Sequence, residues 1–198
     1  MSDYHLIVTT KHEVGLRERK RQVAMKRIQR IAIDRFLAAG FAGATVEEIA
    51  AEADVSPVTI YRYFGTKEGL VLWDEFDPPI LAEIDRRLRT DPPLRAVRDA
   101  LVTLLDVVYD AERHLVLDRS RLIHKEPALL AAALFDSQRF KTAIAASYRS
   151  VTDEYSADVL ASAAVGALIT AVDHWQRRDG KVPLAHLIAQ GFDTLDQT

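Results

Sequence analysis

Residue types that suit contacts with a nucleic acid lie close together in the segment 54–70, DVSPVTIYRYFGTKEGL. It holds a serine, two threonines, two tyrosines, an arginine and a lysine. Hydroxyl and cationic groups bind phosphate oxygens, and arginine also pairs with the major-groove edge of guanine. By composition the run 58–64 is β-branched and aromatic, which favours a strand. The element that presents these side chains therefore has to be argued from the residues around them.

Residues on both sides of this run predict a short helix instead. Ser56 suits the N-cap position and Pro57 the first helical position, where its missing N–H costs nothing. Gly65 suits the end of a helix. On such a helix Ile60 and Phe64, four residues apart, share one side and are expected in the core.

A second capped helix precedes this one in the stretch TVEEIAAEA, 45–53. Thr45 and Glu48 form the sequence signature of a capping box. Ala50 is small where two helices would cross. Asp54 occupies the turn position that needs a left-handed backbone, which Asp tolerates better than most residues. Two short helices joined by a tight turn make a helix-turn-helix motif, here residues 45–64.

Basic residues are concentrated before this motif. The chain has a net charge of −3, yet residues 11–35 contain nine basic and three acidic residues. Apolar positions at helical spacing predict a helix over 17–39, ended by Gly40. A basic first third on an acidic body predicts binding of a polyanion; a solvated basic helix face is the alternative.

These features together predict a surface that contacts DNA. The second helix of the motif would enter a major groove, and the basic helix and the helix starts would reach phosphates. Aromatic residues at helical spacing can also be core, and the sequence leaves open which tyrosine touches the duplex. The predicted DNA contacts are Arg17, Lys20, Thr45, Ser56, Val58, Thr59, Tyr61, Arg62, Tyr63 and Lys67.

The remaining chain has only helical patterns, so we expect an all-α protein of nine or ten helices. One helix is expected to begin at Thr66 and include Trp73, and Pro78–Pro79 predict a kink or a break. The later patterns run over about 94–112, 113–125, 127–151, 156–178 and Pro183 to about Leu195.

Composition excludes several classes of protein. The chain contains no cysteine, so disulfide scaffolds and thiolate chemistry are excluded. There is no stretch of about 20 apolar residues and no secretory signal, so we expect a soluble cytoplasmic protein without a membrane partner. His114 and Asp118 are four residues apart with His124 nearby, but no third ligand has a metal-site spacing. We expect no enzyme, no cofactor and no metal.

The segment 39–76 resembles the DNA-binding domain of TetR-family transcriptional regulators. The features that carry the resemblance are Gly40-Phe41, Gly43, Thr45-Val46, Ile49-Ala50, Val55, Ile60-Tyr61, Tyr63-Phe64 and Lys67-Glu68-Leu70. The first residues show no clear period, so we expect a flexible tail at 1–16. The resemblance covers about 17–77 and implies an N-terminal three-helix helix-turn-helix DNA-binding domain at 17–77 and a C-terminal helical ligand-binding and dimerisation bundle at 78–198. It further implies a homodimer on a palindromic operator, most often a repressor released by a small effector.

The effector domain is less well specified by the sequence. By family layout the helices within about 156–195 form the dimer interface, with Ala157, Ala161, Ala164, Gly166 and Ala167 permitting close approach; an internal core helix is the alternative. A hydrophobic or amphipathic effector is expected, and Arg119 and Arg121 would permit an anionic group. A regulator without a small effector, controlled by a protein partner, is the second hypothesis. The candidate ligand contacts are Trp73, Tyr109, Arg121, Phe135, Phe140 and Trp175.

Overall fold

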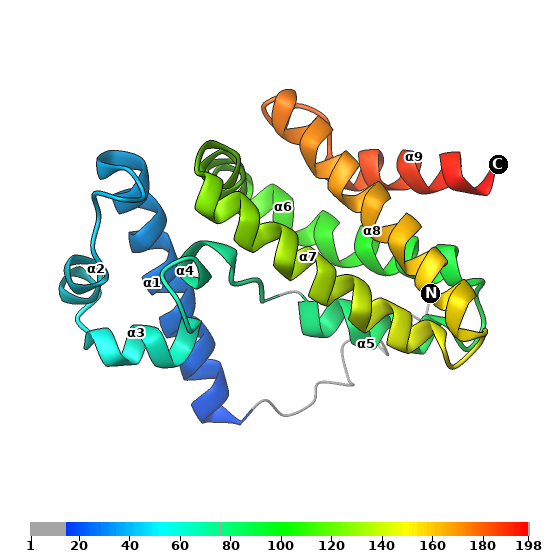
Figure 1. Cartoon of the computed structure of the whole chain (residues 1–198), viewed down its shortest axis with the longest axis horizontal. Helices are drawn as coiled ribbons and strands as arrows, with labels where there is room; N and C mark the ends of the chain where they lie inside the picture. Colours follow the sequence, from blue (N-terminus) through cyan, green and yellow to red (C-terminus); the bar gives the residue numbers. More distant parts are fainter. Residues whose placement is uncertain (1–14, 76, 198) are drawn as a thin grey trace, which may run out of the picture.

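A computed structural model describes the backbone of residues 15–75 and 77–197, and their side chains except those of residues 16 and 106–111. Over this range the chain forms α-helices and no strand, which confirms the predicted all-α class (Figure 1). Residues 1–14 of the tail predicted at 1–16 lie outside the described range, and α1 already begins at Leu16. The helices are α1 (Leu16–Ala39), α2 (Val46–Glu52), α3 (Pro57–Phe64), α4 (Gly69–Leu72), α5 (Asp77–Arg87), α6 (Pro93–Lys125), α7 (Pro127–Tyr148), α8 (Glu154–Arg177) and α9 (Leu184–Asp196).

The helices form two groups, each around a cluster of buried apolar side chains. Helices α1–α4 lie together at one end of the molecule, and α5–α9 form a bundle at the other (Figure 1). The first cluster includes Ile28, Phe36 and Ile60, and it also takes in Leu122 from α6 and Leu129 from α7. The α6–α7 end of the bundle therefore completes the core of the α1–α4 group.

Two interruptions in the helices bear on the predictions. The helix expected from Thr66 through Trp73 is shorter, since α4 spans only Gly69–Leu72 and Trp73 is extended (φ −54°, ψ 126°). Helix α5 then begins at Asp77, so the chain breaks before the two prolines, which occupy the first turn of α5 as their missing N–H groups allow. In α6 the backbone leaves helical geometry at Glu112 (φ −121°, ψ 20°), where the sequence predicts a division between two helices.

Helix α8 is by length and composition apolar enough to cross a membrane, the one such helix among the described residues. A core helix of a soluble protein passes the same test. Its buried side is lined by small residues and ends at Trp175, which is 1% exposed. Ala157, Ala161 and Ala164 lie on this buried side, so they pack within the chain, as the alternative interpretation of this helix expects.

Candidate DNA interface and effector pocket

The turn between α2 and α3 has the backbone that the sequence predicts. Thr45 Oγ1 accepts from Glu48 N (3.2 Å) and Glu48 Oε2 accepts from Thr45 N (2.9 Å), which completes the capping box and holds the pKa of Glu48 below its usual range. Asp54 adopts the left-handed conformation with φ 51°. Arg27 of α1 donates to the carbonyl of Ala53 (2.6 Å), so the basic helix also fixes the end of α2.

Helix α3 buries one side and leaves the other open. Ser56 Oγ accepts from Thr59 N (3.2 Å) and lies 3.0 Å from the Thr59 hydroxyl, which starts the helix at Pro57. Ile60 is fully buried, whereas Val58 is 72% exposed and Tyr61 is 48% exposed. Helix α3 therefore projects a mixed apolar and hydroxyl surface into solvent.

Gly65 and Gly69 allow the sharp exit from α3. Gly65 has φ 76°, a conformation that residues with a Cβ rarely adopt. At Gly69 a Cβ atom would collide with the carbonyl oxygen of Phe64, so only glycine lets α4 begin this close to the end of α3.

Cationic side chains of α1 gather beside the C-terminal end of α3. Arg17, Lys20, Arg21 and Tyr63 line one shallow surface hollow. The guanidinium of Arg21 lies 5.6 Å from the centre of the Tyr63 ring, and that of Arg62 lies 5.3 Å from it. Tyr63 is thus half-buried between two arginines, while Tyr61 stands free of the core.

Lys67 has a different environment from the predicted phosphate contact. Its ammonium donates to the carbonyl of Phe41 (2.5 Å) and lies 4.7 Å from the Phe41 ring centre and 5.5 Å from that of Phe36. This half-buried lysine joins the start of α4 to the turn after α1. Of the other predicted DNA contacts, Arg17, Lys20, Thr45, Ser56 and Arg62 are exposed and Thr59 is half-exposed.

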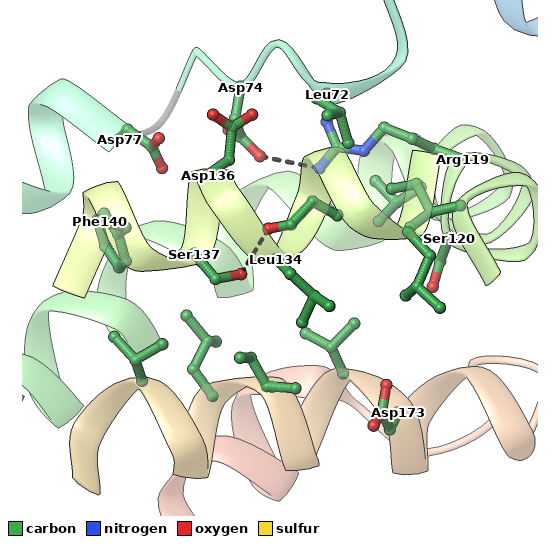
Figure 2. Close-up of a pocket in the computed structure, with 18 of the residues that line it drawn as sticks. Leu72, Asp74, Asp77, Arg119, Ser120, Leu134, Asp136, Ser137, Phe140 and Asp173 are labelled. Carbon is green, nitrogen blue, oxygen red and sulfur yellow. Dashed lines mark hydrogen bonds and ion pairs between the residues drawn. The ribbon is translucent and has the colours of Figure 1, made fainter. Parts of the chain in front are cut away.

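A pocket of about 290 Å³ lies between α4 and α8 (Figure 2). Most of its wall is apolar, including Leu101 and Leu105 of α6, Leu134 of α7 and Leu168 of α8. An apolar cavity with a few polar groups on its wall is typical of small-molecule sites. Its charged or titratable lining residues are Asp74, Asp77, Arg119, His124, Asp136 and Asp173.

The polar groups on the wall are mostly paired. Arg119 donates to Asp74 Oδ2 (2.8 Å) and to the carbonyl of Trp73 (3.3 Å). His124 lies between the carbonyl of Ser120 (Nδ1–O 2.8 Å) and Asp173 (Nε2–Oδ1 3.1 Å). Asp77 makes no hydrogen bond or ion pair with any other described residue. At the pocket rim, desolvation and the Asp74 carboxylate raise the pKa of Asp77 to about 6, although much of the residue is exposed.

Of the five predicted ligand contacts whose side chains are described, the structure brings one, Phe140, to this pocket. Trp73 packs edge-on against Phe64 (ring centres 6.0 Å apart) and Trp175 is buried in the bundle core. Arg121 binds Asp118 and Asp179 on the surface. Phe135, also a predicted ligand contact, is 69% exposed and lies outside the pocket. The side chain of Tyr109 is not among those described.

Sequence reasoning missed the acidic residues of the pocket. The ligand contacts predicted from the sequence are five aromatic rings and one arginine, and they include none of Asp77, Asp136 and Asp173. The available signal was position: each follows an apolar run on a helix, Ala131–Phe135 for Asp136 and Ala171–Val172 for Asp173. An acid at such a place faces either solvent or a cavity.

The histidines considered for a metal site do not assemble one. Within the described residues no three His, Asp or Glu side chains lie close enough together to hold a metal ion. His124 is held by Asp173 across the pocket wall, 49 residues away in sequence.

Comparisons with known proteins match both halves of the chain. A family model for the MftR C-terminal domain matches residues 91–198, and the model for bacterial regulatory proteins of the tetR family matches residues 31–72. The chain is 33% identical over 144 residues to the HTH-type transcriptional regulator TcmR of Streptomyces glaucescens, which covers 69% of this chain and 64% of TcmR, less than two thirds of that relative.

Two further comparisons cover most of the chain. It is 28% identical over 187 residues to a Mycobacterium tuberculosis protein named as the mycofactocin biosynthesis transcriptional regulator MftR, covering 89% of this chain and 91% of that one. The fold is similar to that of Thermus thermophilus FadR, a TetR-family transcriptional repressor solved in complex with lauroyl-CoA, with a TM-score of 0.57, 22% identity and coverage of 86% and 92%.

The family model for the C-terminal domain alone spans more than half of the chain, and the tetR-family model falls on the helix-turn-helix. Members of this family are transcription factors rather than enzymes. The chain therefore belongs to the TetR family of DNA-binding, helix-turn-helix transcriptional regulators.

Proposed function

We propose that the protein is a cytoplasmic homodimeric repressor that binds a palindromic operator and is released by a small apolar or amphipathic effector. The observation that carries this proposal is a shared wall. Asp74, in the connector between α4 and α5, lines the pocket together with Leu72 and Arg119. The same connector is bonded to α1, because Gln29 donates to the carbonyl of Trp73. A ligand in the pocket would therefore press on the segment that positions α1 and α3.

The operator contact rests on the open side of α3. Val58 and the Thr59 methyl group suit thymine methyl groups, and Arg62 suits guanine or phosphate. Tyr61, exposed beside them, suits a phosphate oxygen through its hydroxyl. Arg17, Lys20, Thr45 and Ser56 complete the proposed surface along the backbone of the duplex, with Tyr63 supporting Arg62 and Arg21 through its ring.

The dimer contact rests on the outer side of α8. Tyr155, Val159, Ser162, Gly166 and Thr170 are all exposed, and their spacing places them on one stripe of the helix. A Cβ atom on Gly166 would meet no other atom of the chain, so this position leaves room for a close neighbour. Only 28% of the most apolar 18-residue stretch of α8 is buried within one chain, which supports the packing of a second copy against this helix.

The coupling between the two halves runs through two polar side chains. Gln29 of α1 donates to the carbonyls of Trp73 (2.8 Å) and Val71 (3.4 Å). Arg119 of α6 donates to the same Trp73 carbonyl from the pocket side. We propose a division near residue 77, with 17–77 as the DNA-binding unit and 78–198 as the effector and dimer unit. A ligand that binds one arrangement of this junction better than the other would shift DNA affinity.

The test is binding of the purified dimer to the DNA flanking its own gene, followed by fluorescence anisotropy at several stated salt concentrations. We expect the affinity to fall steeply with salt because phosphate contacts release counterions. Arg62→Ala should weaken binding about 10–100-fold, as loss of a base or phosphate contact does. Arg89→Ala removes another exposed positive charge, in the turn that follows α5, and should change little.

A folded dimer that binds none of this DNA at low salt would contradict the proposal. For the effector, the same assay is repeated with candidate ligands, including lauroyl-CoA, the molecule present in the Thermus structure. Binding to DNA that no ligand class weakens would favour the second hypothesis, a regulator controlled by a protein partner.

A further inference from the structure

Three carboxylates meet at one end of the effector pocket. Asp74 comes from the connector after α4, Asp77 from the first turn of α5 and Asp136 from α7 (Figure 2). The charges of Asp74 and Asp136 both act on Asp77, so the three groups lie within electrostatic range of one another. The chain thus places its acids where three separate elements converge on the cavity.

Two of these acids have a partner within the chain. Asp74 is bound by Arg119 (2.8 Å), and Asp136 is bound by Arg139 (3.1 Å) from the same helix. Asp77 has no such bond among the described residues. The charged groups that face it are therefore Asp74 and Asp136, which oppose its ionisation, and Arg119 and Arg139, which favour it. After pairing, this end of the pocket retains one uncompensated carboxylate.

The rest of the cavity is apolar. Beyond the acidic end, the pocket wall is apolar and includes Phe140 and four leucines, Leu101, Leu105, Leu134 and Leu168. A volume of about 290 Å³ suits a compact ligand rather than a whole nucleotide-bearing thioester. Shape and charge together describe a molecule with one apolar body and one charged end.

We propose that the effector is a cationic amphiphile, an alkyl- or arylamine whose apolar body packs against Leu134 and Leu168 and whose ammonium pairs with Asp77. This inference rests on the proposed effector function of the same pocket and names its ligand class. It replaces the anionic group expected from Arg119 and Arg121, because Arg119 is bonded to Asp74 and Arg121 is bonded to Asp118 and Asp179 outside the pocket.

The experiment compares three probes with the same chain length and different charge: decylamine, 1-decanol and decanoate. Each is titrated by calorimetry, below its micelle concentration and without DNA, into the purified full-length protein at pH 8. We expect decylamine to bind about tenfold more tightly than decanol, and decanoate to bind least. Asp77→Asn should remove the tenfold advantage of the amine and leave decanol unchanged. Asp85→Asn, an exposed acid on the same helix but outside the pocket, should change neither.

Lowering the pH from 8 to 5 adds a readout that a purely structural role of Asp77 would not give. Because the pKa of Asp77 is about 6, its carboxylate is lost across this interval and the preference for the amine should shrink. In the Asp77→Asn variant the preference should show no such pH dependence. Thermal unfolding of both variants confirms that they are folded.

The outcomes separate this inference from the proposed function. Equal or tighter binding of decanoate, or an Asp77→Asn variant that keeps the amine preference, overturns the cationic class. If decanol still binds and weakens the DNA complex in that case, the effector function stands. If none of the three probes binds, both the cationic class and the pocket's role as a site for simple apolar ligands are overturned, while operator binding is judged separately.

Discussion

In the DNA-binding half, α1–α4, long polar side chains from one element bind backbone carbonyls of another and close the gaps between helices. These bonds are Lys67 to Phe41 (2.5 Å), Arg27 to Ala53 (2.6 Å) and Gln29 to Trp73 (2.8 Å). In the bundle, α5–α9, polar side chains such as Asp77 and Asp136 instead face an open cavity. Polar side chains thus join the helices of one half and line a cavity in the other.

The difference corresponds to what each half has to do. A surface that reads DNA must hold its side chains in one geometry, and the bond from Arg27 to the Ala53 carbonyl fixes the end of α2, a helix too short to be stable alone. If the bundle binds an effector as proposed, its cavity costs stability until a ligand supplies the missing contacts. Predictions that compare the two halves test this interpretation.

The largest expected effect separates the packed part of the bundle from its pocket wall. Trp175 is 1% exposed in the bundle core, whereas Phe140 is half-exposed beside a cavity that already exists. Trp175→Ala should lower the free energy of unfolding by about 3–5 kcal/mol, as for other buried aromatics. Phe140→Ala should cost clearly less. Urea denaturation of both variants at one fixed protein concentration measures the difference.

Equal losses of stability in the two variants would mean that the pocket wall is packed as tightly as the core. If Trp175→Ala loses ligand binding but keeps its stability, the result would support the ligand contact that the sequence predicts for Trp175.

The second prediction tests whether Lys67 fastens the fold or contacts DNA. Lys67→Met keeps the apolar stem but removes the charged donor to the Phe41 carbonyl, a bond of a class worth about 1.5–3 kcal/mol. We expect a loss of stability within this range, measured by urea denaturation. Lys181→Met, an exposed lysine between α8 and α9, is the matched control. Unchanged stability together with weaker, less salt-dependent DNA binding would support the phosphate contact predicted from the sequence.

Local signals explain why the DNA-binding half could be predicted closely. The caps at Thr45 and Ser56, the glycine at Gly65 and the left-handed Asp54 each act within four residues of the chain. Such signals are contained in the sequence itself. The predicted end of α4 was wrong because the interaction at this end is not local. Gln29, more than forty residues away in the sequence, donates hydrogen bonds to the carbonyls of Val71 and Trp73.

The pocket could not be predicted in the same way, because it exists only where five helices meet. Aromatic residues were poor indicators: the large ring of Trp175 is drawn into the core by its apolar area, and Phe135 lies on the outer side of α7. The arginine chosen for an anion, Arg121, is paired with Asp179, 58 residues further along the chain. The predicted small-residue face of α8 likewise divides into a buried and an exposed side only once α7 and α9 are in place.

The third prediction distinguishes the two tyrosines of α3. Tyr61 is 48% exposed, so Tyr61→Ala should lower operator affinity by about 1.5–3 kcal/mol, the loss of one hydrogen bond to a charged phosphate, and leave unfolding unchanged. Tyr63 packs against the core and between two arginines, so Tyr63→Ala should lower both affinity and stability. Anisotropy and thermal unfolding on the same samples separate these effects. The reverse pattern would assign the phosphate contact to Tyr63.

The smallest expected effect is the loss of folding stability that the ionised Asp77 carboxylate causes when no ligand is present. Its pKa is raised from 3.8 to about 6 in the folded chain, so folding favours the protonated acid. The associated stability is fully present below pH 4 and is lost as the pH rises through about 6. Asp77→Asn should therefore stabilise the protein above pH 7, by about 1 kcal/mol after allowing for the solvent screening of an exposed carboxyl.

Thermal unfolding at fixed protein concentration should show this gain as a rise of about 2–4 °C at pH 8 that disappears near pH 4. Asp85→Asn, on the same helix and in solvent, should show no such pH-dependent gain. If Asp77→Asn instead lowers stability at pH 8, the carboxylate already has a favourable partner in the folded chain. The proposed contrast between the two halves would then be wrong for Asp77. A gain at pH 8 that a bound amine abolishes would tie the unsatisfied charge directly to ligand recognition, because the wild-type carboxylate would then have its counter-ion.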